Sequence, residues 1–172
     1  MRVANRRGFS LIELLLYIGL LSLFLVAATS SLWDIILGNV KSGVQQEVQE
    51  SLRYITHRIQ FELRNADSIN PASDFGVNLS TNPSAVLSVS SPAPDDPTEF
   101  RVSSGVLQIK RGSGNWTALT SGAVEVATLT FTDLSDSNSE NVQFTVTVKY
   151  RNPSGRSQWE REATFEGAAQ LR

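Results

Sequence analysis

The chain has 172 residues, of which 41% are hydrophobic, and a formal net charge of -2 at pH 7. This length allows one compact domain plus one further element, and the balanced charge gives no indication of a nucleic-acid partner. Because the sequence contains no cysteine, disulfide bonds, thiolate metal sites and cysteine nucleophiles are excluded.

The first element is a long apolar run. The 20 residues from Leu14 to Trp33 carry no charge. As a helix they would rise about 30 Å, which matches the hydrocarbon thickness of a bilayer. The sequence "LVAATSS" at 25–31 could imitate a signal-peptide cleavage site, but the apolar region of a signal peptide is commonly only about 7 to 15 residues long. We therefore favour a retained transmembrane helix.

Basic residues stand just before this run, at Arg2, Arg6 and Arg7. Basic flanks of membrane helices remain in the cytoplasm. The sequence thus predicts a single-pass protein of the cytoplasmic membrane with its N-terminus inside. Everything after about residue 38 is expected outside the cytoplasm.

Glu13 is an ionisable residue at the start of the apolar run. An acidic side chain costs about 2.5 to 3.5 kcal/mol at the centre of a membrane helix, less near its end, and usually has a partner. Phe9 and Glu13 are four residues apart, so both lie on one helical face. The alternative is that Glu13 lies at the level of the lipid headgroups and stays hydrated.

Residues 6–16, "RRGFSLIELLL", resemble the N-terminal processing motif of type IV pilins and pseudopilins. The shared features are a short basic leader ending in Gly, an aromatic residue, and Glu at the fifth position of the processed chain. The resemblance implies that a prepilin peptidase cuts between Gly8 and Phe9 and that Phe9 becomes the N-methylated first residue. It also implies that Glu13 pairs with the N-terminal amine of a neighbouring subunit in a bacterial filament.

An amphipathic helix is expected to follow the apolar run. Gly38 and Gly43 each lower helix propensity by about 1 kcal/mol relative to Ala, so we expect a kink or a short melted segment there. The helix should end near residues 65–71, because Asn70 precedes Pro71. Apolar residues recur at intervals of three or four beyond the glycines: Val44, Val48, Leu52, Ile55, Ile59, Leu63 and Ala66. Its charged residues either form a solvated face or pair with neighbouring subunits: Glu47, Glu50, Arg53, Arg58, Glu62 and Arg64.

Strand patterns fill the rest of the chain. Strict alternation at 141–150 predicts a strand with one buried face. The segment 124–134 is rich in Thr and Val, and its phase slips around Ala127, which indicates a β-bulge. Alternation at 159–167 begins at Trp159, and Pro153 and Gly155 predict a hairpin turn before it. Shorter strands are expected at 85–90, 99–103 and 106–110, with a turn at 111–115 and an irregular loop at 91–97.

The apolar stripe of the amphipathic helix requires a surface to cover it. We therefore predict an α+β fold in which a long N-terminal helix, transmembrane in its first part and amphipathic in its second, packs on an antiparallel β-sheet. The expected organisation is a cytoplasmic leader at 1–8, a transmembrane and assembly helix at 9–38, and an extracytoplasmic pilin-like domain at 39–172. Residues 51–69 and 160–172 are also similar, more weakly, to the minor pseudopilin J and minor pilin W group.

No catalytic constellation is evident. The single histidine, His57, lies in the amphipathic helix and is expected at its surface, and no phosphate loop or nucleophile elbow occurs. Oxygen-bearing residues in "DLSDSNSE" form a weak calcium candidate: Asp133, Asp136, Asn138 and Glu140. This stretch lacks the Gly and the distal Glu of an EF-hand loop, and the alternative is a solvated hairpin tip.

The resemblance implies a non-enzymatic minor pilin or pseudopilin without a cofactor, first in the bacterial cytoplasmic membrane and then in a type IV pilus or a type II secretion pseudopilus. Its partners would be other pilin-like subunits, the prepilin peptidase, the inner-membrane assembly platform and membrane lipid. The alternative is a membrane-anchored, monomeric extracytoplasmic binding domain. Secretion, adhesion, motility and DNA uptake all stay open.

Overall fold

The computed structural model describes residues 10–152, 154–155 and 157–172. The chain comprises two compact units, Met1–Val40 and Lys41–Arg172. Helix α1, Leu11–Asn65, contributes to both units. The expected leader at 1–8 lies outside the described residues.

Helix α1 is uninterrupted at Gly38 and Gly43. The expected melted segment is therefore wrong. The cost of two glycines, about 1 kcal/mol each, is tolerated within a helix of 55 residues, because the hydrogen-bonded turns on either side propagate through them. A Cβ at either glycine would meet no atom within 4 Å, so no close packing requires glycine there.

Two antiparallel sheets follow the helix, where the sequence indicated one. The first sheet has the strand order β1-β2-β3-β4-β5, and the second has the order β6-β7-β8. Strands of the first sheet are β1 (Ser68–Ile69), β2 (Leu87–Ser90), β3 (Thr98–Ser103), β4 (Val106–Arg111) and β5 (Thr117–Ala118). Strands of the second sheet are β6 (Val124–Asp133), β7 (Asn141–Tyr150) and β8 (Glu162–Gln170).

A two-residue turn joins β3 to β4. Ser104 and Gly105 both have positive φ, 52° and 75°, which is the backbone that a tight hairpin of this twist requires. A Cβ on Gly105 would lie 3.0 Å from the Cβ of Glu125 on β6. The glycine therefore permits both the turn and the close approach of the two sheets.

The second sheet confirms the expected bulge and the expected hairpin. The pairing of β6 with β7 shifts between Val126 and Thr128, and β7 pairs antiparallel with β8. The prediction that the last strand begins at Trp159 is wrong, because Ser157–Trp159 form a 3-10 turn. The Trp159 ring packs edge-on against Tyr150 at 5.8 Å between centroids, and the strand starts only at Glu162.

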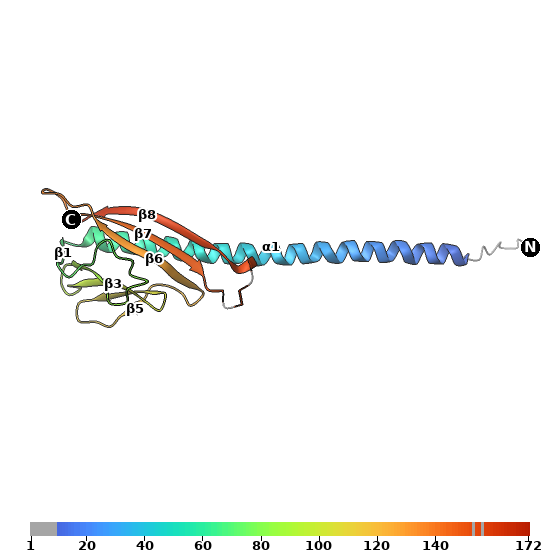
Figure 1. Ribbon diagram of the computed structural model, residues 1–172, viewed down its shortest axis with the longest axis horizontal. Coiled ribbons are helices and arrows are strands. Elements are labelled where there is room, and N and C mark those ends of the chain that lie inside the picture. The colour runs from blue at the N-terminus through green and yellow to red at the C-terminus, as the bar shows by residue number, and fades with distance from the viewer. Residues whose placement is uncertain (1–9, 153, 156) are drawn as a thin grey trace, which may run out of the picture. The chain divides into compact units, whose positions relative to one another are not determined.

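The core lies in the unit Lys41–Arg172, between α1 and both sheets. Figure 1 shows β6, β7 and β8 alongside the second part of α1. The apolar stripe predicted from the sequence is buried there in full, from Val44 to Ala66. Its partners include the fully buried rings of Phe100, Phe131 and Phe144. The observed architecture is thus a long helix packed on antiparallel sheets, as predicted.

Candidate assembly segment

The first turn of α1 presents Glu13 on an apolar surface. The Ser10 carbonyl accepts the backbone N–H groups of Glu13 at 3.1 Å and Leu14 at 3.2 Å, which begins the helix. An acidic side chain in the first turn also interacts favourably with the helix macrodipole. Glu13 is exposed and lies in a shallow groove formed by Ile12, Leu16, Tyr17 and Leu20. The carboxylate is therefore surrounded by apolar side chains and is open to a partner.

Apolar side chains surround this part of α1 on every side. All the large apolar residues from Leu11 to Leu37 are exposed, by 37% to 77%. The helix is long and apolar enough to cross a membrane, and none of its most apolar stretch is buried within the chain. Monomeric soluble proteins rarely expose contiguous apolar patches of more than a few hundred Å². Lipid or other helices must therefore cover this surface.

The serine and threonine hydroxyls within the apolar run are satisfied by the helix itself. The Ser22 hydroxyl donates to the Ile18 carbonyl. The Thr29 hydroxyl lies 3.0 Å from the Leu25 carbonyl, and the Ser31 hydroxyl lies 3.1 Å from the Ala27 carbonyl. Such bonds remove the need for water as a partner. These hydroxyls are therefore compatible with the interior of a bilayer.

Gly8 and Phe9, the expected cleavage and methylation positions, lie outside the described residues. Their roles stay predictions that rest on the sequence. Glu13 is described, and it lies four residues after Phe9 in the sequence.

Glu62 differs from both expectations for the charged helix face. Its side chain is only 7% exposed, and its Oε1 atom lies 2.8 Å from Nη2 of Arg58 and also accepts from Nη2 of Arg111 on β4. Burial raises the pKa of Glu62, the Arg58 guanidinium opposes that rise, and Asp95 adds to it. Glu62 therefore ties α1 to the first sheet. Its position beside Leu63, on the flank of the apolar stripe, is the signal that sequence reasoning missed.

The carboxylates of the first two calcium candidates accept backbone hydrogen bonds within the turn between β6 and β7. Asp133 accepts the Ser135 N–H at 2.8 Å, and Asp136 accepts the N–H groups of Asn138 at 2.8 Å and Ser139 at 2.9 Å. Hydrogen bonds from Ser135 lower the pKa of Asp133, and those from Asn138 and Ser139 lower the pKa of Asp136.

Glu140, the last of the calcium candidates, accepts the backbone N–H of Ile69 at 2.6 Å. Within the described ranges, no group of three His, Cys, Asp or Glu side chains is placed to hold a metal ion. His57 is exposed on α1, as expected.

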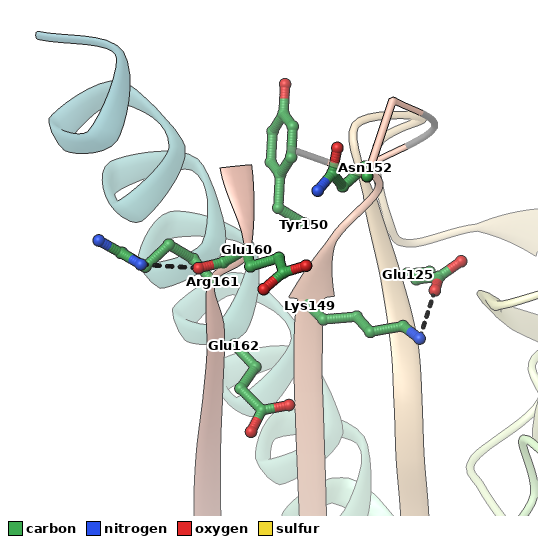
Figure 2. Close-up of a pocket in the computed structure, with 8 residues that line it drawn as sticks. Glu125, Lys149, Tyr150, Asn152, Glu160, Arg161 and Glu162 are labelled. Atoms are coloured by element: carbon green, nitrogen blue, oxygen red, sulfur yellow. Dashed lines mark hydrogen bonds and ion pairs between the residues drawn. The ribbon is translucent and has the colours of Figure 1, made fainter. Parts of the chain in front are cut away.

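A charged hollow of about 530 Å³ lies at the β7–β8 hairpin (Figure 2). Nζ of Lys149 lies 2.8 Å from Oε1 of Glu125, which links β7 to β6. Nη1 of Arg161 donates to the Glu160 carbonyl at 2.7 Å. The lining that the structure describes contains no nucleophile paired with a base, so the geometry gives no support for covalent catalysis.

Comparison with known families identifies the N-terminal segment. The prokaryotic N-terminal methylation motif matches residues 3–29. This match includes the Gly8–Phe9 junction, Glu13 and the first part of the apolar run. A search of curated proteins and a search of solved structures found no match. The chain therefore carries a prokaryotic N-terminal methylation motif at the start of a helix that is long and apolar enough to cross a membrane, and in both features it is similar to type IV pilin-like proteins.

Proposed function

We propose that the chain is a minor pilin or pseudopilin, a structural subunit of a type IV pilus or of a type II secretion pseudopilus. The observation that carries this proposal is the methylation motif at residues 3–29. It lies on a helix whose apolar side chains are exposed and so need lipid or neighbouring helices to cover them.

Processing precedes assembly in this proposal. Arg2, Arg6 and Arg7 hold the leader in the cytoplasm, where the prepilin peptidase cuts between Gly8 and Phe9. The new amine of Phe9 is then methylated. The domain from residue 39 onward lies outside the cytoplasmic membrane, and the inner-membrane assembly platform draws the processed subunit into the filament.

Glu13 guides docking through charge compensation. A single processed subunit places one carboxylate among apolar side chains, where an acidic group usually has a partner. The amine of Phe9 on a neighbouring subunit supplies an opposite charge at similar membrane depth. Docking therefore gives the Glu13 carboxylate the positively charged partner that it lacks in the isolated subunit. The neighbouring helix also covers the exposed apolar groove in which Glu13 lies.

The proposed role is structural rather than enzymatic, as is general for pilin-type proteins. Two cations of the hairpin hollow are held in place, Lys149 by an ion pair with Glu125 and Arg161 by a hydrogen bond to the Glu160 carbonyl. Nothing in this arrangement supports a chemical step.

Intact-mass measurement of the native protein tests the proposal. We expect a chain that lacks residues 1–8 and carries one methyl group on its N-terminal amine. The same protein from cells without prepilin peptidase should retain the leader and stay in the membrane. A native chain that begins at Met1 and still functions would contradict the proposal and support a membrane-anchored, monomeric binding domain.

A further inference from the structure

The two edges of the β6-β7-β8 sheet are treated differently. The outer edge of β6 is covered by other parts of the chain. Phe131 and Leu129 accept backbone hydrogen bonds from Gly76 and Leu79, both at 2.8 Å, and Val126 donates to Gly105 at 2.8 Å. The β6 edge is therefore closed to further strands.

The outer edge of β8 is open. The Tyr150 N–H donates to the Arg161 carbonyl at 2.8 Å, and this bond fixes the phase of the β7–β8 ladder. In an antiparallel pair, alternate residues direct their backbone groups toward the partner strand. The outward set on β8 therefore comprises Glu162, Thr164, Glu166, Ala168 and Gln170, all of which are exposed.

These outward residues make no backbone hydrogen bond on their free side within the part of the chain that the structure describes. The next outward residue, Arg172, does have a partner, because its N–H donates to the Ala66 carbonyl at 3.0 Å. In Figure 1, β8 is the outer strand of its sheet, with β7 between β8 and β6. An unpaired row of N–H and C=O groups is a template for another strand.

The charge of this edge selects its partner. Glu162 and Glu166 are the only ionisable residues in the outward set, and neither forms an ion pair among the described residues. Residues directly opposite each other in adjacent strands share a face of the sheet. Pairing of two copies of β8 would therefore gather four carboxylates on one face, where the neighbouring cation, Lys149 opposite Glu162, is already paired with Glu125. A strand with basic side chains would neutralise them.

We propose that the free edge of β8 binds an extended segment of another protein that carries Lys or Arg at positions i and i+4, opposite Glu162 and Glu166. The partner adds a strand to the sheet by main-chain hydrogen bonds, and the two basic side chains set the register. This contact goes beyond assembly through the N-terminal helix, and it requires neither cleavage after Gly8 nor Glu13.

Peptide binding to the full chain in detergent micelles tests this inference. The probe is a fluorescent peptide as long as β8, 9 residues, with alternating Thr and Val and with Lys at its fifth and ninth positions, which lie opposite Glu166 and Glu162 when the peptide pairs antiparallel along the whole strand. The control peptide carries Glu at those two positions. We expect the Lys peptide to bind about tenfold more tightly by fluorescence anisotropy. The double variant Glu162→Lys with Glu166→Lys should reverse this preference.

A pair of variants at Thr164 separates strand addition from simple charge attraction. Thr164→Pro removes an outward N–H while the ladder to β7 retains its inward bonds, so it should abolish binding. Thr164→Ala, which loses the same side chain, should bind normally. Circular dichroism verifies that both variants fold. If the Pro variant does not fold, the test of the inference is whether the double variant Glu162→Lys with Glu166→Lys reverses the peptide preference.

Three outcomes would overturn the inference: equal affinity for the two peptides, no binding of either peptide, or undiminished binding by a folded Pro variant. A fourth is self-association. Because the chain has no cysteine, a Thr164→Cys variant would report it by forming a disulfide-linked dimer. All of these readouts are independent of leader processing, so their failure is distinguishable from failure of the proposed function.

Discussion

The two parts of α1 differ in what covers their apolar side chains. From Leu11 to Leu37 these side chains point in all directions and are exposed. From Val44 to Leu63 they form one stripe that the chain's own sheets bury. The comparison teaches that the pattern of apolar residues indicates their partner. A stripe predicts burial within the chain, whereas apolar character on all sides predicts lipid or other subunits.

The largest effect is expected when the charge of Glu13, in the first turn of the exposed part, is removed. We expect Glu13→Val to reduce incorporation into filaments at least about tenfold, because docking no longer compensates a charge that costs up to about 2.5 to 3.5 kcal/mol in a membrane helix and less near its end. Glu13→Asp, which keeps the charge, should be incorporated far better. Immunoblots of sheared filaments against membranes measure the ratio. Equal recovery of the Val variant would show that Glu13 is merely a hydrated residue near the headgroups.

A matched pair of isoleucines sharpens the comparison. Ile55 is fully buried and Ile35 is 61% exposed. Ile55→Ala should lower the free energy of unfolding by about 2 to 5 kcal/mol, because it leaves a cavity in the core. Ile35→Ala should change it by less than about 0.5 kcal/mol. Denaturant unfolding in detergent, followed by circular dichroism, measures both. A similar loss for the two variants would mean that the exposed part is also covered from within.

A smaller effect concerns pH and Glu62. Its raised pKa means that the folded state binds the proton more tightly than the unfolded state does. The contribution of Glu62 to stability is therefore complete below the ordinary pKa of about 4.5 and is lost as the pH rises through the raised value.

Glu62→Gln should remove this dependence. Subtracting the two unfolding curves cancels the opposite contributions of Asp133 and Asp136, whose pKa values are lowered. A difference between wild type and variant that stays constant from below pH 4.5 to neutral pH would refute this assignment.

The smallest effect is expected at the β6–β7 turn. The carboxylates of Asp133 and Asp136 already accept backbone N–H groups, so added calcium should leave the unfolding midpoint of the full chain unchanged. Calorimetry with calcium provides the second measurement. Heat of binding that disappears in an Asp136→Ala variant would instead establish a metal site at this turn.

The sequence predicted those elements whose signals are local. Alternation over residues 141–150 gave β7, the slip at Ala127 gave the bulge, and the spacing of Val44 to Ala66 gave the buried stripe. The N-terminal segment was recognisable for the same reason, since its motif is contiguous.

Features that depend on distant partners escaped prediction. Strands β1 and β5 have two residues each and exist only because a neighbouring strand pairs with them. The division into two sheets follows from pairings that no single segment encodes. Burial of Glu62 depends on Arg111, which lies 49 positions away in the chain. The alternating pattern of 159–167 suggested that Trp159 is the first residue of the last strand. Trp159 instead lies in a 3-10 turn, where its ring packs against Tyr150, a residue of the preceding strand.

Because residues 76–79 hydrogen-bond to the edge of β6, only one edge of the β6-β7-β8 sheet can accept a further strand. With one accessible margin, a subunit can take part in a single lateral strand addition. If both margins were accessible, subunits could join side by side into a ribbon of unlimited width, in competition with polymerisation through the helix. In the proposed filament, the closed edge of β6 would leave growth through the helix as the open-ended process.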